Sequence, residues 1–306
     1  MMRRIAVIQA TRSMPTSRDI ITGALWTLAS AVSFMVANIL IRHLSATLPP
    51  LEMALFRAAG GMILVLVAWR AFRHLRQLRD PHWHLLRAGV GAVSLVALVH
   101  AYSTLPVALV AGVMYVRVVL VIPMQKVILG EGADRRVWLA AGIGIAGALV
   151  ALWPRLLAIS TPHGNWGALA LIVAAFAGAG SQICMRRLAR TNPASVVVAV
   201  SAVLISAVVA VPASAVAVTP PPADLPWLVG IGLLSALAQW STVRGYKHAS
   251  PAVLMPVTLV DIPLALAAGY LLFGEVPTGH AAFGSALVVA AAFYVTRICP
   301  DGLRKA

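Results

Sequence analysis

Charged residues are scarce in this sequence. Only 11% of its 306 residues are Asp, Glu, Lys or Arg, while 60% are hydrophobic. Soluble domains are nearer half apolar and a quarter charged, because they need enough polar surface to cover their core. The composition therefore excludes an ordinary soluble domain and indicates a surface that faces lipid. A mean hydropathy of +0.90 agrees with this interpretation.

Cysteine and the signatures of catalysis are equally sparse. Cys184 and Cys299 have no neighbouring Cys or His at metal-ligand spacing, and we interpret both as packing residues. No HExxH, GxSxG or GxxxxGK[ST] motif occurs. We therefore expect no metal, no cofactor and no enzymatic activity, and any uphill transport would depend on an ion gradient or on exchange.

Acidic side chains are few as well, since nine Asp and Glu stand against 24 Lys and Arg, for a net charge of +15. Such an excess could indicate nucleic-acid binding. The basic residues, however, lie in short segments between apolar runs and form no separate basic domain. Basic flanks beside apolar runs are typical of membrane spans, so nucleic acid is not an expected partner.

Ten apolar runs remain when the chain is divided at Pro, Gly and charge clusters. Each is close to the ~20 residues that cross the hydrocarbon as a helix. Helix is required because an open strand would leave its backbone unpaired in lipid. We predict an all-α membrane protein with ten transmembrane helices, at 20–42, 52–72, 83–104, 106–128, 136–154, 166–188, 194–214, 226–246, 251–273 and 279–297.

Basic residues are distributed unevenly around these predicted helices. Twenty of the 24 Lys and Arg residues fall on the side of the N-terminus, whereas only Arg42 and Arg155 fall on the other side. Cytoplasmic segments are enriched in Lys and Arg. We therefore expect a multi-pass protein of a bacterial inner membrane with both termini cytoplasmic, residues 1–19 and 298–306 being basic tails.

The chain also repeats itself at a constant offset of 144 residues. The offset equals five predicted helices, and five is odd, so the second copy enters the membrane from the opposite side. We predict two inverted five-helix repeats, 20–154 and 166–297, joined by an external linker, 155–165. Inverted repeats are the architecture of many secondary transporters. The coinciding pairs are Gly23 and Gly167, Arg42 and Arg186, Trp83 and Trp227, Tyr102 and Tyr246, Gly130 and Gly274, and Glu131 and Glu275.

Several local motifs resemble the drug/metabolite transporter superfamily, in its EamA-like family. The motifs are Leu55-Phe56-Arg57, the run from Ala101-Tyr102 to Leu105-Pro106-Val107-Ala108, and the two ends Leu129-Gly130-Glu131 and Phe273-Gly274-Glu275. The resemblance covers about residues 20–297. It implies a ten-helix carrier, exporter or importer, of amino acids, purines, nucleotide-like metabolites, vitamins, sugars or metal-chelating metabolites.

Within this family the chain is somewhat similar to the S-adenosylmethionine-type carriers. Those carriers have an Arg and a Glu spaced three apart after a proline of the ninth helix. Here Pro256 is followed by Thr258 and Asp261. Asp261 keeps an acidic residue in place of the Glu, whereas Thr258 stands in place of the Arg. An S-adenosylmethionine-like substrate is therefore one alternative among several.

Two ionisable residues lie near the middle of predicted spans and share one position of the repeat. Arg117 is in the fourth span and Asp261, 144 residues later, is in the ninth. Charges at such depth usually face a polar cavity or a partner. One hypothesis is that Arg117 binds a carboxylate or phosphate and Asp261 binds an amine or exchanges a proton. The alternative is a permanent ion pair that fixes helix packing.

Other polar and aromatic residues are weaker candidates for the substrate cavity. Arg57 could meet an anionic substrate or snorkel to headgroups, and His100 could be a pH-sensitive gate or an interfacial donor. Amides between helices often only hold helices together. The remaining candidates are Met114 and Tyr115 in the fourth span, Gln239 and Trp240 in the eighth, and Asn38 and Gln182 at matched positions of the first and sixth.

Three prolines could bend the helices that carry the two charges. Pro123 lies in the fourth span, and Pro256 and Pro263 lie in the ninth. Proline frees a backbone carbonyl and bends a helix, which suits a gate or a static kink. Glu131 and Glu275 each follow a helix-ending Gly. We expect these acids to be structural, each placed before the next helix, where an anion is favoured.

These features favour a secondary carrier of a small polar or zwitterionic metabolite. The alternatives are a membrane-embedded binding or sensor protein without transport and an intramembrane enzyme that acts on lipid. The expected partners are the small-molecule substrate and the lipid bilayer. Protons or a counter-substrate, and a second copy of the chain in a homodimer, stay open.

Overall fold

The computed structural model describes residues 17–67, 79–128, 135–157, 166–192, 194–216, 218–248, 254, 257–258 and 260–298. Within these residues every regular element is an α-helix, as the composition predicted. The helices are α2 (Ser17–Leu44), α3 (Pro50–Val67), α4 (Pro81–Thr104), α5 (Val107–Met114), α6 (Val116–Ile128), α7 (Arg135–Leu157), α8 (Gly167–Thr191), α9 (Ala194–Val216), α10 (Leu225–His248), α12 (Asp261–Phe273) and α13 (Gly279–Ile298).

Five stretches of the described helices are long and apolar enough to cross a membrane. They are Ile21–Leu44, Pro81–Thr104, Trp138–Leu157, Gly167–Met185 and Ala199–Val216. Shorter apolar helices lie at Val107–Val121, Asp261–Phe273 and Gly279–Tyr294. The all-α architecture is therefore confirmed, while the count of ten spans stays a prediction.

Two of the predicted spans are not single helices in the structure. The fourth is divided at Tyr115, between α5 and α6. In the ninth, α12 begins at Asp261 after a turn at Val260, whereas Val257 and Thr258, before that turn, are again helical.

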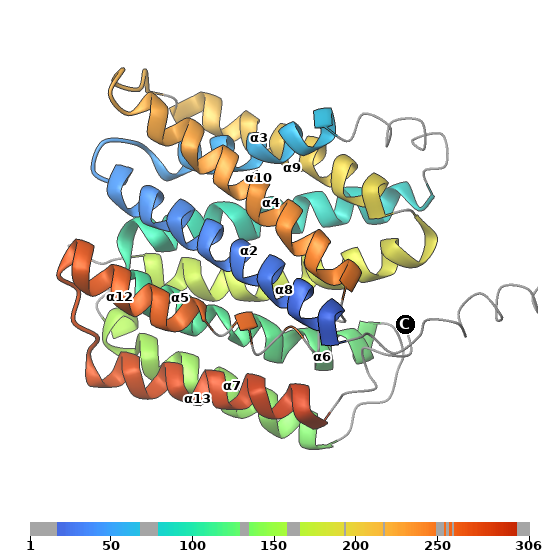
Figure 1. The fold of residues 1–306 in the computed structure, drawn as a ribbon. Coiled ribbons are helices and arrows are strands. Elements are labelled where there is room, and N and C mark those ends of the chain that lie inside the picture. The colour runs from blue at the N-terminus through green and yellow to red at the C-terminus, as the bar shows by residue number, and fades with distance from the viewer. Residues whose placement is uncertain are drawn as a thin grey trace, which may run out of the picture.

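The helix packing follows the sequence repeat (Figure 1). Residues of α2 correspond to residues of α8 at the offset of 144, and residues of α4 correspond to those of α10. Exchange of the two halves therefore turns the pair of α2 with α10 into the pair of α8 with α4. Correspondingly, α2 packs against α10, and α4 packs against α8. Pairs that the exchange leaves unchanged, such as α3 with α9 and α7 with α13, also pack together. This pattern is that of a pseudo-twofold axis between the two halves.

Two buried serines show the same exchange at the level of single hydrogen bonds. Ser30 of α2 donates to the carbonyl oxygen of Ala238 in α10, at 2.9 Å. Ser94 of α4 donates to the carbonyl oxygen of Ala174 in α8, also at 2.9 Å. Ser30 and Ala174 occupy one repeat position, and Ser94 and Ala238 occupy another. The two crossings therefore have the same register, with the donor on opposite members of the pair.

Helices α7 and α13 approach so closely that only glycine fits at their crossing. A Cβ added to Gly284 would lie 2.4 Å from the backbone nitrogen of Ala151 and 2.4 Å from the carbonyl oxygen of Gly147. A Cβ added to Gly147 would lie 2.8 Å from the carbonyl oxygen of Gly284. Small residues allow this backbone contact, on which helix association in lipid depends.

Substitution of Gly284 by alanine should separate α7 from α13. Because the added methyl group meets backbone atoms, we expect a loss of about 1–3 kcal/mol in unfolding free energy, seen as a fall of about 3–10 °C in the melting temperature of the purified protein. Gly142 of α7, with nothing within 4 Å of an added Cβ, is the matched control. Equal melting temperatures for Gly284→Ala and Gly142→Ala would contradict the close crossing.

Candidate functional site

Two helices are interrupted at matched positions of the repeat. At the first interruption the Tyr115 N–H donates to the carbonyl oxygen of Gly112 at 3.3 Å, three residues back. Just before α12, the Val260 N–H likewise donates to Val257, at 3.2 Å. The offset places position 259 opposite Tyr115. Interrupted helices at membrane depth are tolerated where they line a cavity or are buried in protein.

Tyr115 links the two interruptions directly. Its side chain is 7% exposed, and its hydroxyl group donates to the carbonyl oxygen of Thr258. Helices α5 and α12 also pack against each other. Tyr115, predicted to line the cavity, therefore lies between the halves and provides a hydrogen-bond donor to the backbone beside the second interruption.

Arg117 and Asp261 begin the helices that follow the two interruptions. Arg117 is the second residue of α6 and Asp261 is the first residue of α12. The Arg117 side chain lies over Gly178 of α8, where an added Cβ would be 2.9 Å from its Cδ. Oδ1 of Asp261 is buried and has no hydrogen-bond partner among the described residues.

The charges of Arg117 and Asp261 interact electrostatically. This interaction is compatible with both hypotheses, a permanent ion pair that fixes helix packing and a site that binds the two ends of a zwitterion.

Arg57 and Asn38, two of the predicted residues, are brought together. Nη1 of Arg57 in α3 donates to Oδ1 of Asn38 in α2 at 2.7 Å. The guanidinium group lies 5.5 Å from the ring centre of Phe34, also in α2. Arg57 also interacts electrostatically with Tyr102 and with Arg117.

Tyr102 is a buried residue near these charges that the sequence analysis did not propose for the site. It lies in the last turn of α4 and is 5% exposed. It interacts electrostatically with Arg57, Asp261 and Arg117. A hydroxyl-bearing aromatic inside a predicted span was the available signal, but the sequence analysis used Tyr102 only as a repeat pair with Tyr246 and as part of a family motif.

Gln182 and Gln239 are exposed although they lie on the inner sides of their helices. By helical periodicity, Gln182 lies within about 40° of buried Leu171 and Gly178 around α8. Gln239 lies equally near buried Gly232 and Ser235 around α10. Each glutamine side chain is therefore accessible while its neighbours along the same side of the helix are buried.

Trp240 lies apart from the polar centre. Its ring centre is 5.2 Å from that of Trp26 and 4.9 Å from the Arg244 guanidinium carbon. Trp240 and Arg244 share the exposed stripe of α10 with Leu237. A cation–π contact on the outer face, where the tryptophan ring meets Arg244, explains this position better than contact with substrate.

The remaining predicted residues are placed as follows. Met114 ends α5 and packs, half-buried, against the core, and His100 is half-buried in α4. Pro123 lies within α6, and Pro263 lies in the first turn of α12, where its missing N–H breaks no intrahelical bond. Pro256 lies outside the described residues. Among the described residues, no group of three or more His, Cys, Asp or Glu could hold a metal ion.

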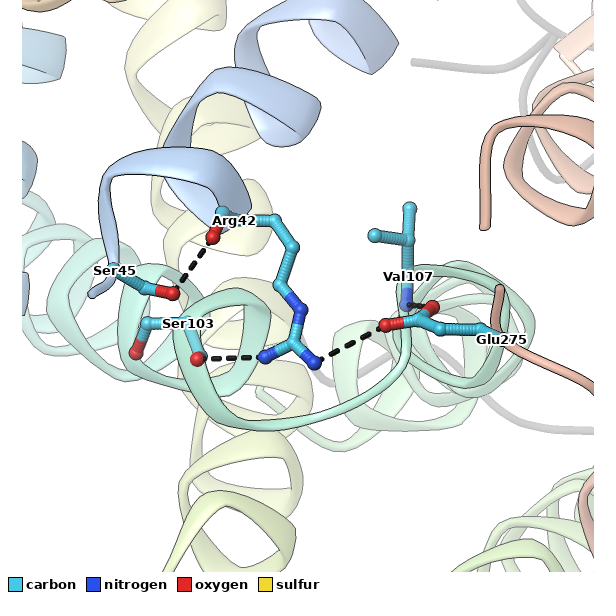
Figure 2. Close-up of polar contacts among 5 residues, drawn as sticks. All are labelled: Arg42, Ser45, Ser103, Val107 and Glu275. Atoms are coloured by element: carbon cyan, nitrogen blue, oxygen red, sulfur yellow. Dashed lines mark hydrogen bonds and ion pairs between the residues drawn. The ribbon is translucent and has the colours of Figure 1, made fainter. Parts of the chain in front are cut away.

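A second polar cluster joins three segments at one end of the bundle (Figure 2). Arg42, near the end of α2, donates to the carbonyl oxygen of Ser103 at 2.8 Å and pairs with Oε1 of Glu275 at 3.2 Å. Oε2 of Glu275 accepts the Val107 N–H, the first of α5, at 2.8 Å. We call this cluster the Arg42–Glu275 latch.

The latch corrects one prediction about Glu275. Gly274 ends α12 with φ of 62°, as expected for a helix-ending glycine. Glu275 does not serve the next helix, α13, whose first turn is instead bonded by Thr278, 3.3 Å from the Ala281 nitrogen. It serves α5, because the reversal at Gly274 turns the carboxylate back toward the positive end of that helix. Glu131 lies outside the described residues.

A protein-family model described as the EamA-like transporter family matches residues 21–153 and again residues 165–297. The chain belongs to the EamA-like transporter family. The resemblance seen in the Gly–Glu and aromatic–Arg motifs is therefore confirmed. Together with its apolar helices, this membership makes the EamA-like protein a multi-pass membrane protein of a transporter family.

Relatives of this EamA-like protein have transporter names. A riboflavin transporter of Vibrio cholerae is 26% identical over 90% of this chain and 93% of the relative. A riboflavin transporter of Rhizobium johnstonii is 26% identical over 94% and 95%. The pseudopaline exporter CntI of Pseudomonas aeruginosa is 28% identical over 90% and 96%. These names point to transport rather than to enzymatic chemistry.

A solved crystal structure of a protein also matches this EamA-like protein. The TM-score is 0.60 and the sequence identity is 20%, over 91% of this chain and 97% of the other. At this level of identity the match shows a shared fold.

The latch should contribute measurably to stability. Its side chains are 25% and 12% exposed, so solvent screens the pair only partly, and we expect a coupling of about 1 kcal/mol between Arg42 and Glu275. A double-mutant cycle of Arg42→Ala and Glu275→Ala, read as unfolding free energy, measures it. Glu275→Gln should lose the ion pair and keep an acceptor for Val107. Strictly additive effects of the two alanine substitutions would contradict the latch.

Proposed function

We propose that this EamA-like protein is a secondary transporter of a small polar or zwitterionic metabolite. Arg117 binds a carboxylate or phosphate of the substrate, and Asp261 binds its amine. The observation that carries the proposal is the placement of these opposite charges at one repeat position, each at the start of a helix beside an interruption. Transporter sites are commonly built from such interrupted helices.

We further propose ten spans in two inverted five-helix halves, with both termini cytoplasmic and the inner membrane as location. The exchanged hydrogen bonds of Ser30 and Ser94 support a twofold relation between the halves. The uneven distribution of Lys and Arg supports the orientation. Two halves of opposite direction give two access states, open inward or outward, around one shared site.

Energy for uphill transport would come from an ion gradient or from exchange. Asp261 is the residue best placed to exchange a proton, because one oxygen of its buried carboxylate has no partner among the described residues. In such a cycle the carboxylate would bind the substrate amine and the proton alternately. Arg117, which stays protonated, would hold the anionic group throughout.

The relatives guide the choice of substrate. Their names include riboflavin transport and pseudopaline export, and both compounds are small organic metabolites. Amino acids, S-adenosylmethionine-like compounds, vitamins and metallophore-like compounds are therefore the classes to test, in either direction. The second candidate function is a membrane-embedded binding or sensor protein, because the same polar centre could bind a ligand without moving it.

Counterflow in proteoliposomes separates a transporter from a binding protein. Vesicles loaded with an unlabelled candidate from these classes should accumulate the labelled compound transiently and saturably. A sensor would bind the compound, seen as a rise in melting temperature, and show no counterflow. Binding without flux for every stabilising compound would reject the carrier and favour the sensor.

The two charges of the site should each be essential. Arg117→Gln and Asp261→Asn should each lower uptake or efflux at least 100-fold at normal expression, because one end of the substrate loses its partner in a medium of low dielectric constant. The matched controls are Arg155→Gln and Asp224→Asn, since Arg155 is exposed and Asp224 makes an exposed contact with Thr47. Normal transport by both site variants would remove the proposal.

A further inference from the structure

We infer that Trp26, Trp240 and Arg244, here called the Arg244 cluster, bind an anionic phospholipid on the outer face of the bundle. The cluster lies where α2 packs against α10 (Figure 1). The lipid phosphate accepts hydrogen bonds from the guanidinium group, and one acyl chain lies along α10. The inference goes beyond the proposed function, because it concerns the surface that faces lipid and does not involve the substrate.

Two indole rings hold the guanidinium group of Arg244 in place. Its central carbon lies 4.9 Å from the ring centre of Trp240 and 6.0 Å from that of Trp26. The two ring centres are 5.2 Å apart, with an angle of 84° between the ring planes. Cation–π contacts of this kind orient the guanidinium group and leave its N–H groups able to donate. A phosphate can accept two of them in a bidentate bond.

Arg244 lies at the depth where lipid headgroups begin. The next residue, Gly245, is level with Gly23 of α2, because a Cβ added to it would be 3.2 Å from the Gly23 carbonyl oxygen. Gly23 is close to the start of the apolar stretch Ile21–Leu44. The exposed Arg244 side chain therefore reaches the boundary between hydrocarbon and headgroups, where Trp and Arg side chains are typical.

An exposed apolar stripe of α10 continues from Arg244 into the membrane. Trp240, Leu237 and Leu233 are 37%, 45% and 49% exposed. Helical periodicity places these residues and Arg244 within about 60° of one another around the helix. Leu233 lies about 16 Å along the helix from Arg244, which is close to half of the ~30 Å hydrocarbon thickness. One acyl chain of a lipid with its phosphate at Arg244 therefore covers this stripe.

The equivalent crossing of α4 with α8 shows that helix packing does not require the cluster. Both crossings have the same register, as the hydrogen bonds of Ser30 and Ser94 show. Three positions nevertheless differ, since the offset of 144 places Ala170, Val96 and His100 opposite Trp26, Trp240 and Arg244. The cluster is thus an addition to one of two similar crossings, and a ligand outside the protein explains it better than packing does.

The charge of the headgroup decides which phospholipid the cluster favours. Arg stays protonated in proteins, so Arg244 attracts a headgroup with a net negative charge. The ammonium group of a zwitterionic phospholipid opposes part of this attraction. An acidic side chain, Asp19, contacts His248 at 3.9 Å, one turn beyond Arg244 in α10, and does not occupy the place of the phosphate.

Native mass spectrometry of the purified protein measures the binding of single lipid molecules. Titration with phosphatidylglycerol and with phosphatidylcholine of equal chain length gives a dissociation constant for the first molecule of each. We expect phosphatidylglycerol to bind at least fivefold more tightly. Arg244→Gln should weaken its binding at least fivefold, and Trp240→Ala at least twofold. Arg155→Gln is the matched control, because Arg155 is exposed and lies two residues from the exposed Trp153 in α7.

Equal phosphatidylglycerol affinities of wild type and Arg244→Gln would overturn the inference, as would equal wild-type affinities for the two lipids. The melting temperature without added lipid tests a merely structural role. A loss of stability in Arg244→Gln with unchanged lipid affinity would assign the cluster to packing. If Arg244→Gln does not fold, the lipid preference of the wild type and the weaker binding of Trp240→Ala still decide the inference.

Glycerophosphoglycerol, the same headgroup without acyl chains, separates a lipid site from a site for free phosphate compounds. We expect a tenfold excess of it over phosphatidylglycerol to leave the bound lipid in place, because it makes no contact with the apolar stripe of α10. Displacement of the lipid at equal concentrations would make the cluster a general anion site and reject the phospholipid. These measurements need no transport activity, so their outcome is independent of the proposed function.

Discussion

The structure depends on one constraint, that backbone groups inside a bilayer must be paired within the protein. An interrupted helix violates this constraint unless another segment provides partners. Here the two interruptions face each other, and the Tyr115 hydroxyl reaches across to the carbonyl oxygen of Thr258. Arg117 and Asp261 follow one residue or two beyond these interruptions. The hydrogen bond between Tyr115 and Thr258 thus offsets part of the cost of breaking two helices.

The repeat sets how the helices pack, and sequence differences between the two copies place different side chains at corresponding positions. The crossings of α2 with α10 and of α4 with α8 keep one register, even though the serine has moved from one helix to its partner. At the centre, the same repeat position holds Arg in one half and Asp in the other. A symmetric scaffold can in this way enclose an asymmetric ligand, since equal backbones present different groups. Arg57 adds a further difference in charge between the halves, because its repeat counterpart is the neutral Ser201.

Part of this arrangement could be predicted from the sequence, because a constant offset between repeats shows which residues occupy corresponding positions in the two halves. The offset predicted the matched placement of Arg117 and Asp261. Other features depended on contacts between distant segments. The interruption at Tyr115 falls between Met114 and Val116, without a proline or glycine to mark it. Tyr102 and Trp240 are both aromatic residues within predicted spans, and only the rotation of α4 and α10 decides that one is buried at the centre and the other faces outward. Glu275 was expected at the following helix, since sequence shows its chain neighbours and not the start of α5.

The latch has a consequence for the balance between the two ends of the molecule. Glu275 accepts the amide hydrogen of Val107, and the offset replaces Val107 by Pro251, which has no amide hydrogen to give. The bond that ties one end of the bundle therefore has no chemical equivalent at the corresponding position of the other half. Two identical copies of one unit would have this bond at both ends or at neither. A single imino acid therefore makes the two ends chemically unequal, because the bond from a backbone amide to the carboxylate can form at only one of them.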